Sequence, residues 1–248
     1  MKAAFRRVLI KLSGERLAGE AGFGIRPAVI ADLAREIVSV QALGTQVAIV
    51  IGGGNIIRGV QAEAQGIDRH TGDYMGMLGT LINALALQDA VEKAGAPSRV
   101  QSALAIQAVC EPYIRRRALR HLDKNRVLIF ACGTGNPEFT TDTAAALRAS
   151  EVGAEVILMA KSGVDGVYSA DPKRDPSARR YEVLSFQRAI QDDLGVMDQT
   201  ALSQCKKNQM PIVVFDSGVS GNIRRVAAGE PIGTWVADVP RPLPPAEP

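Results

Sequence analysis

An apolar run that ends on three consecutive glycines constrains this chain more than any other feature. Residues 49–55 read IVIGGGN, which is typical of a buried strand that ends in backbone without side chains. A charged ligand can approach the peptide N–H groups of such backbone closely, and a helix that begins there adds a partial positive charge. The pattern therefore predicts a phosphate-binding loop at the carboxyl end of a strand.

The combination of an apolar strand and a glycine-containing loop occurs twice more. Residues 127–132 read VLIFAC and are followed by GTGNP at 133–137, while the first apolar run closes on KLSG at 11–14. One such loop could be a tight turn, but three of them suggest a single pocket. Because the carboxyl ends of parallel strands lie along one edge of an open α/β sheet, we expect these segments to meet there around several phosphates.

Apolar periodicity predicts strands and helices that alternate along the chain. Strands are expected at 8–12, 46–51, 99–103, 127–132, 155–159, 212–215 and 234–237, and helices at 27–43, 74–93, 112–122 and 143–152, from about 185, from about 198, and at 222–228. This alternation is typical of a mainly parallel sheet with helices on both faces. The predicted fold class is therefore α/β, a three-layer αβα sandwich.

The domain organisation follows from length and local composition. With 248 residues, 46% of them hydrophobic, the chain can bury the core of one large domain or of two closely joined lobes, and we expect a single domain over 1–239. Residues 164–180 contain an Asp-Gly turn between β-forming residues and predict a small β excursion over the sheet edge. Five prolines in 240–248 predict a disordered tail.

Composition narrows the classes of partner and chemistry. The 29 Lys and Arg residues nearly balance the 26 Asp and Glu residues, so the net charge of +3 does not predict binding to nucleic acid. No run approaches the roughly 20 apolar residues of a membrane span, and we expect no membrane partner. Three widely spaced cysteines without a signal peptide predict a reduced, cytoplasmic location. Two histidines, and no Cys/His cluster with zinc spacing, argue against a zinc enzyme or a Ser-His-Asp hydrolase.

Three charged residues could support phosphoryl transfer, which needs cations and amide donors around the moving group. Lys11 and Lys161 lie at the ends of apolar strands, where either could instead be a lysine that extends into solvent. Asp142 follows two threonines at an expected helix start, where it could cap the helix or orient the lysines or a magnesium ion. The chain has no Gly-Lys dipeptide and no G-x-G-x-x-G, which excludes a Walker A loop and gives no support to a Rossmann or protein-kinase loop.

Five motifs, in unbroken order from about Arg7 to Ala237, resemble those of the bacterial uridylate (UMP) kinases of the amino-acid kinase fold. They are KLSG at 11–14, GGGN at 52–55 with Arg58 and Gly59, GDYMGM at 72–77, GTGNP at 133–137 running into FTTD at 139–142, and VDGVYSADP at 164–172. The GDYMGM element is similar to a nucleoside-monophosphate acceptor site, rather than to the amino-acid site of other members of the fold. The resemblance implies ATP-dependent phosphorylation of UMP to UDP, with Mg²⁺.

The resemblance also implies roles for individual residues. ATP would be bound by Lys11, Leu12, Ser13, Gly14, Gly54, Arg58, Ser162, Tyr168 and Asp171, and the ATP-binding part of the domain would begin at about residue 160. UMP would be bound by Gly53, Asp73, Thr134, Gly135, Asn136, Pro137, Glu138, Phe139, Thr140 and Thr141, with Asp73 on the ribose hydroxyls. Lys11, Asp142 and Lys161 would support the transferring phosphoryl group, and no residue is expected to bind a metal directly. The chain departs from some members beside Ser162, where they have one residue fewer, and at Glu138, where they have another residue.

Regulation and assembly are further implications of the resemblance. Residues Gly19, Glu20, Ala21, Gly22, Phe23 and Gly24 are similar to a segment associated with activation by GTP, and UTP is expected to inhibit. The family implies a homohexamer, for which the apolar helix expected at 74–93 is the candidate contact. Two other functions stay open at this point: an amino-acid or carbamate kinase of the same fold, and a nucleotide sensor without catalysis.

Overall fold

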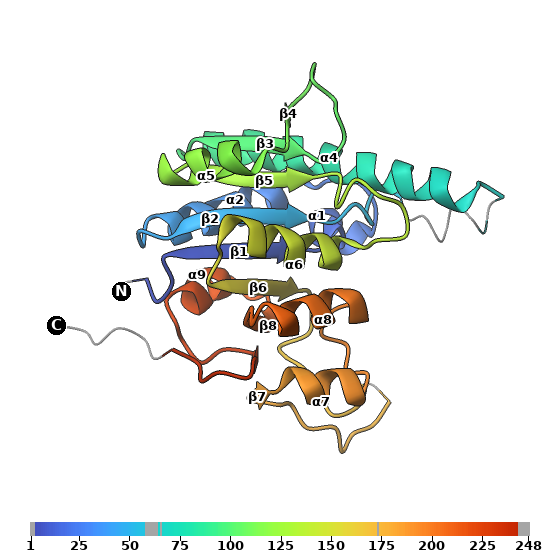
Figure 1. Ribbon diagram of the computed structural model, residues 1–248, viewed down its shortest axis with the longest axis vertical. Helices are drawn as coiled ribbons and strands as arrows, with labels where there is room; N and C mark the ends of the chain where they lie inside the picture. Colours follow the sequence, from blue (N-terminus) through green and yellow to red (C-terminus); the bar gives the residue numbers. More distant parts are fainter. Residues whose placement is uncertain (1–2, 58–63, 65, 173, 243–248) are drawn as a thin grey trace.

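A mainly parallel sheet forms the centre of the molecule (Figure 1). The computed structural model describes residues 3–57, 64, 66–172 and 174–242. Within these residues nine strands lie in the order β4-β3-β5-β2-β1-β6-β8-β9-β7, and each neighbouring pair is parallel except β8 with β9. The strands are β1 (Arg7–Leu12), β2 (Gln46–Ile51), β3 (Ser98–Ser102), β4 (Glu111–Pro112), β5 (Val127–Ala131), β6 (Val156–Lys161), β7 (Val183–Leu184), β8 (Ile212–Asp216) and β9 (Thr234–Val236).

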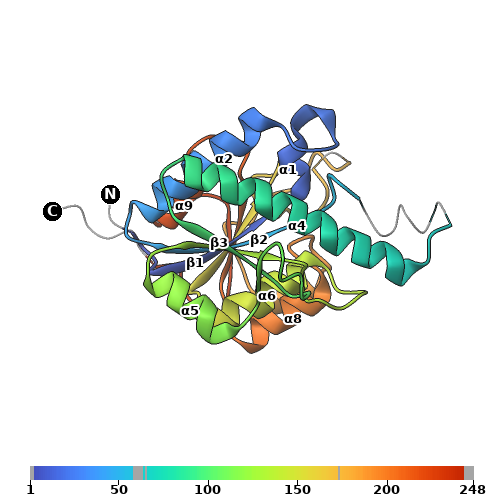
Figure 2. The same cartoon turned by 90° about the horizontal axis from the view of Figure 1, so that it is seen from above.

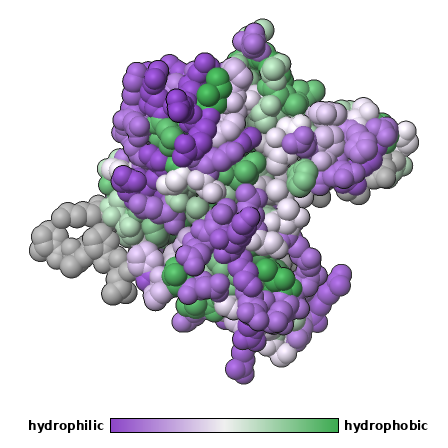
Figure 3. Space-filling view, viewed as in Figure 1, coloured by the Kyte–Doolittle hydropathy of each residue, from purple (hydrophilic) through white to green (hydrophobic). Residues whose placement is uncertain are grey.

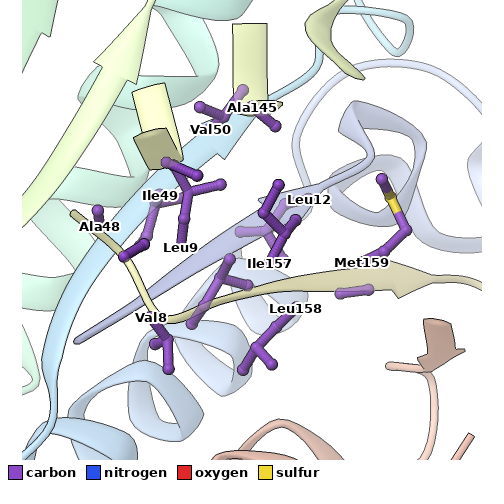
Figure 4. Close-up of a cluster of buried hydrophobic side chains, with 14 of the residues drawn as sticks. Val8, Leu9, Leu12, Ala48, Ile49, Val50, Ala145, Ile157, Leu158 and Met159 are labelled. Carbon is purple, nitrogen blue, oxygen red and sulfur yellow. The ribbon is translucent and has the colours of Figure 1, made fainter. Parts of the chain in front are cut away.

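The central strands are buried on both faces, which explains their nearly uninterrupted apolar sequences. Ile10 of β1 is fully buried and pairs with Ile49 of β2 on one side and Leu158 of β6 on the other. Figure 4 shows side chains of these three strands close together, with Ala145 above them. These three strands form the middle of the core. Because they are packed and paired along their length, the positions of the residues at their carboxyl ends are well defined.

Helices cover both faces of the sheet, so the predicted α/β fold class is confirmed. They are α1 (Gly14–Ala18), α2 (Pro27–Gln41), α4 (Arg69–Lys93), α5 (Arg115–Asp123), α6 (Thr141–Val152), α7 (Phe186–Gln191), α8 (Gln199–Lys207) and α9 (Asn222–Ala227), with a 3₁₀ turn, η1 (Gly19–Ala21). Figure 2 shows α1, α2, α4 and α9 on one side of the sheet and α5, α6 and α8 on the other. No helix in the described ranges is both long enough and apolar enough to cross a membrane.

The long helix α4 begins five residues before the predicted Tyr74, so that prediction of its start was wrong. Its N-cap is Asp68, whose carboxylate accepts a hydrogen bond from the Thr71 backbone N–H at 3.0 Å. Asp73 consequently lies in the second turn of the helix instead of in a turn before it. The first turns of α4 project from the body of the molecule, as Figures 1 and 2 both show.

Several other local predictions need correction. Pro112 belongs to a short strand and not to a helix, since α5 begins at Arg115. The short elements α1, β4 and β7 were not expected, because runs of two to five residues carry little periodicity. In the described part of the predicted β excursion, which leaves out residue 173, Tyr168 and Arg180 form an antiparallel bridge and no named strand occurs.

The start of the predicted disordered tail is attached to the domain. Arg241 donates hydrogen bonds to the backbone carbonyls of Glu230 and Ile232 at 2.5 and 3.3 Å. The rest of that tail, residues 243–248, lies outside the described residues. The carboxyl ends of β1, β2, β5 and β6 point to the same edge of the sheet, and Lys11 and Lys161 lie at that edge.

Candidate active site

Two lysines and one aspartate meet at this edge of the sheet. Lys11 is the fifth residue of β1, Lys161 is the last residue of β6, and Asp142 lies in the first turn of α6. The Lys11 ammonium lies 2.6 Å from Oδ1 of Asp142, with both side chains largely buried. The Lys161 ammonium donates to the backbone carbonyl of Gly195 at 2.8 Å. The structure therefore brings together all three residues predicted to support phosphoryl transfer.

The helix that carries Asp142 is capped by a different residue. Thr140 is the N-cap of α6, and its hydroxyl accepts hydrogen bonds from the backbone N–H groups of Asp142 and Thr143 at 3.0 and 3.4 Å. Asp142 is thus not the cap, which was one of its two predicted roles. Its carboxylate is available for Lys11 instead, and a negative charge in the first helical turn is also favourable for the helix dipole.

Two cavities adjoin at Lys11 and Asp142, which line both of them. The larger, of about 740 Å³, is lined among others by Gly53, Asp73 and Thr134, and the smaller, of about 240 Å³, by Ser13, Lys161 and Ser162. Because Lys11 and Asp142 line both cavities, the site has two compartments that share one ion pair. The surface seen in Figure 3 is mostly polar, with hydrophobic residues in several smaller patches.

Most of the predicted acceptor residues line the larger cavity. They are Gly53, Asp73, Thr134, Glu138, Phe139, Thr140 and Thr141, whereas Gly135, Asn136 and Pro137 are not among its lining residues. Of the residues predicted to bind ATP, Lys11, Ser13 and Ser162 line the smaller cavity, and Gly54 lines the larger one. Leu12, Gly14, Tyr168 and Asp171 line neither of these two cavities, and Arg58 lies outside the described residues.

The glycines after β2 have a packing role that the sequence pattern did not reveal. A Cβ on Gly53 would lie 2.6 Å from the Gly76 carbonyl oxygen and 2.8 Å from the Thr80 nitrogen, so this loop packs directly against the backbone of α4. A Cβ on Gly14 would lie 2.6 Å from the carbonyl oxygen of Gly52. Glycine is needed at these two positions because the backbone of one segment packs directly against the backbone of another. The absence of a side chain would also let a phosphate approach the backbone.

The loop after β5 is held onto α4 by hydrogen bonds, two of which come from backbone N–H groups of the loop. The backbone N–H of Cys132 donates to the Thr80 hydroxyl at 2.7 Å, and that of Glu138 donates to Oδ2 of Asp73 at 2.9 Å. Cys132 and Glu138 both have positive φ angles, 60° and 69°, which non-glycine residues rarely adopt. Such backbone is often found at ligand sites, because the surrounding contacts must hold it in place.

Sequence reasoning missed two side chains of the site. Arg69 lines the larger cavity and donates to both carboxylate oxygens of Asp73 at 3.2 and 3.3 Å, which adds a cation to the acceptor compartment. Asp198 caps α8, and its carboxylate also accepts hydrogen bonds from the hydroxyls of Thr140 and Thr143. An aspartate before a helix signals a cap. Only the fold reveals that Asp198 also holds the start of α6.

The electrostatic environment of Lys161 gives a prediction for stability. Burial lowers the pKa of Lys161, the Lys11 charge lowers it further, and the Asp142 charge opposes the shift. Because the unfolded chain then binds more protons than the folded one, the free energy of unfolding rises with pH between the lowered pKa and about 10.4. A variant without the Lys161 ammonium should lack the part of this pH dependence of stability that Lys161 contributes.

We expect Lys161→Met to unfold with a smaller gain in stability between pH 7 and pH 10 than the unmodified protein. Chemical denaturation at a series of pH values measures this. Lys93→Met, at an exposed lysine of α4, is the control and is expected to keep the original pH dependence. Equal slopes for all three proteins would show that Lys161 is hydrated like a surface lysine.

A comparison with protein families identifies the fold family. The model of the amino acid kinase family matches residues 6–216. The chain belongs to the amino acid kinase family. Solved structures give a narrower likeness. The UMP kinase from Bacillus anthracis superimposes with a TM-score of 0.92 at 43% identity, covering 95% of this chain and 97% of that one.

Two further structures support the same likeness. The UMP kinase from Ureaplasma parvum has a TM-score of 0.89 at 37% identity, covering 96% of this chain and 100% of that one. The uridylate kinase from Archaeoglobus fulgidus has a TM-score of 0.72 at 33% identity, covering 93% and 99%. The predicted resemblance to UMP kinases is therefore confirmed over nearly the whole chain.

Proposed function

We propose that this chain is a UMP kinase that transfers the γ-phosphoryl group of ATP to UMP, giving UDP and ADP. The observation that carries the proposal is the pair of cavities that adjoin at Lys11 and Asp142. A reaction between two bound nucleotides needs two compartments that open onto the same charged groups. We assign UMP to the larger cavity and the ATP phosphates to the smaller one, with the N-terminal part of the chain binding the acceptor and the part from about residue 160 completing the ATP site.

The chemistry requires little covalent help from the protein. An oxygen of the UMP phosphate attacks the γ-phosphorus, and the bond from that phosphorus to the bridging oxygen breaks, so that ADP leaves with the electron pair. Lys11 and Lys161 place positive charge where negative charge spreads over the transferring group. Asp142 holds the Lys11 ammonium at 2.6 Å, which keeps this cation in place before the reaction.

Magnesium fits this site as a companion of ATP. The ion prefers oxygen ligands and is commonly bound through one or two carboxylates and substrate phosphates, with several waters retained. Within the described ranges no group of three or more His, Cys, Asp or Glu side chains could form a cage of protein ligands, and Asp142 supplies a carboxylate between the cavities. We propose that Mg²⁺ arrives on the ATP phosphates, where it would neutralise developing charge.

The acceptor compartment favours a nucleotide over an amino acid. Asp73 lines it, and a carboxylate there can accept hydrogen bonds from the two hydroxyls of a ribose, which glutamate and aspartate do not have. A volume of about 740 Å³ also lies within the usual range for sites of drug-sized ligands. A nucleotide sensor without catalysis would have no need for two lysines and an aspartate at the junction.

Acceptor profiling tests the proposed function. The purified protein is mixed with ATP and Mg²⁺ and with UMP, CMP, glutamate, aspartate or carbamate in separate reactions, and ADP formation is followed. We expect turnover with UMP far above that with every other acceptor. Turnover with an amino acid or carbamate would establish the alternative kinase class, and nucleotide binding without ADP formation would establish a sensor.

We further propose that the enzyme is a cytoplasmic homohexamer activated by GTP and inhibited by UTP. An exposed stripe on α4 supports the assembly, since Tyr74, Leu78 and Ile82 recur every four residues and are 43%, 44% and 48% exposed. The three cysteines are free, which suits a reducing compartment.

The assembly leads to a prediction for mass in solution. We expect light scattering at micromolar concentration to give several times the chain mass of 26.3 kDa. Ile82→Glu is expected to lower that mass, because a charge would have to be buried in the contact. Arg35→Glu, on an exposed face of α2, is the control and should leave the mass unchanged. An active monomer would exclude the α4 stripe as a subunit contact.

A further inference from the structure

Two buried side-chain amides lie behind the phosphate-binding loop. Asn55 directly follows the three glycines and is 1% exposed, and Asn83 lies in the middle of α4 and is 0% exposed. Nδ2 of Asn83 donates to Oδ1 of Asn55 at 2.6 Å, and Nδ2 of Asn55 donates back to Oδ1 of Asn83 at 3.1 Å. The pair is therefore reciprocal.

The remaining amide hydrogens of the pair are also used. Asn83 donates to the carbonyl oxygen of Gly52 at 2.7 Å, and Asn55 donates to that of Gly24 at 2.7 Å. Each Nδ2 carries two hydrogens, so both amide groups are fully satisfied as donors. A buried network of this kind is costly when broken and, when complete, favours one arrangement of the segments that it joins.

Asn55 is the point at which three separate segments meet. Its backbone carbonyl accepts a hydrogen bond from the Gly24 N–H at 2.9 Å, which doubles its link to the 19–24 segment. A Cβ on Gly14 would lie 2.5 Å from Oδ1 of Asn55, so the loop after β1 packs against the same amide. Asn55 thus lies in the loop after β2 and contacts both the loop after β1 and the 19–24 segment. Asn83 connects Asn55 to α4.

The composition of α4 makes Asn83 stand out. Its buried neighbours on this helix include Leu81, Ala84 and Leu87, and an apolar residue at position 83 would avoid the desolvation of an amide. The amide is explained by what it reaches, because Gly52 and Asn55 are two residues of the phosphate-binding loop.

We propose that Asn83 is a positioning residue which, through Asn55, holds the phosphate-binding loop and the 19–24 segment in one arrangement on α4. A ligand that restricts the motion of the nucleotide site should then also restrict the motion of the 19–24 segment, and the reverse should hold as well. This inference rests on the proposed function only for its two ATP readouts, the protection of Gly24 by ATP and the KM values. Asn83 does not touch Gly24 in any hydrogen bond described, so an effect of Asn83 on Gly24 must pass through Asn55.

Hydrogen exchange of the full-length protein tests the coupling. In Asn83→Leu, which keeps the branched shape of the side chain and removes the amide, we expect the peptide that contains Gly24 to exchange about tenfold faster or more. The control is Gln88→Leu, which removes a half-buried amide from the same helix that bonds to Ser98 and not to the loop. It should leave exchange at Gly24 unchanged.

Binding of ATP provides the second readout. In the unmodified protein we expect ATP to slow exchange at Gly24, and in Asn83→Leu we expect this protection to be largely lost. The KM for ATP should rise about tenfold, and the KM for UMP should rise too, because Gly53 and Gly54 of this loop line the cavity proposed for UMP. If Asn83→Leu does not fold, Asn83→Ser, which replaces the amide by a shorter hydroxyl, serves in its place with the same expected direction.

The outcomes separate this inference from the proposed function. Exchange at Gly24 that matches the Gln88→Leu control, with ATP protection retained, would overturn the coupling even in an active UMP kinase. An unmodified protein that fails to phosphorylate UMP would overturn the proposed function, while the exchange rates at Gly24 would still decide whether Asn83 positions this segment.

Discussion

We expect Lys11→Ala to lower kcat by about 10²–10³ while leaving the KM for UMP nearly unchanged. Lys11 lies between the two cavities and is held by Asp142 at 2.6 Å, so its ammonium faces the place where the phosphoryl group would move. A cation in this position interacts more strongly with the transition state than with either bound nucleotide. Its loss should therefore reduce turnover more than binding.

The matched control for Lys11 is Lys93→Ala. Lys93 forms an ion pair of the same length, 2.6 Å, with Asp89, but this pair is exposed on α4 and lines neither of the two proposed nucleotide cavities. Steady-state kinetics should give unmodified values for this variant. If Lys11→Ala keeps nearly full turnover at saturating ATP, Lys11 is only a strand-end lysine and the proposed mechanism is wrong.

The sheet could be predicted from sequence because its strands are buried on both faces. Runs such as VLI at 8–10 and VAIVI at 47–51 are apolar throughout, and glycine or charged residues lie within a few positions of the observed strand ends. Helix α2 was similarly clear, because Ile30, Leu33 and Ile37 recur on one face. Short elements such as β4 could not be predicted, because two residues carry no periodicity and their pairing with β3 depends on how the fold places them.

The start of α4 illustrates why the boundaries of a helix are harder to predict than its existence. The stretch from Asp68 to Asp73 is polar, so it lacks the apolar periodicity that identified the rest of the helix. The cap at Asp68 was the available signal, since aspartate is favoured at that position.

The candidate site could be predicted where a residue lies at the end of a buried strand, as Lys11 and Lys161 do. Parallel strands bring their ends to one edge, so proximity follows from the strand order. The residues that hold these groups could not be predicted in the same way. Asn83 contacts the glycine loop after β2 from the middle of a helix, and Asp198 reaches α6 from the cap of α8. Such contacts depend on how helices pack on the sheet, which residue spacing does not specify.

We expect the enzyme to prefer UMP over dUMP by at least tenfold, and Asp73→Ala to remove most of that preference. A carboxylate can accept hydrogen bonds from both ribose hydroxyls, whereas deoxyribose supplies only one, and a buried acceptor left without a partner costs about 1–3 kcal/mol. Asp73 lines the acceptor cavity, and Arg69 and the Glu138 N–H hold its carboxylate in position. The KM for UMP should therefore rise at least tenfold, while that for ATP stays nearly the same.

The comparison of UMP with dUMP separates ribose binding from a purely structural role of Asp73. Because Asp73 also holds the loop at Glu138, its loss could loosen the acceptor site, but a loosened loop would weaken UMP and dUMP equally. Loss of the ribose contact weakens UMP more than dUMP, because dUMP has only one of the two hydroxyls to lose. Asp89→Ala, elsewhere on α4, should change neither. Steady-state kinetics with one substrate varied at a time distinguish these cases. If Asp73→Ala disturbs ATP and spares UMP, the two nucleotide cavities are assigned the wrong way round, and if glutamate or aspartate is the better acceptor, the amino-acid kinase alternative holds.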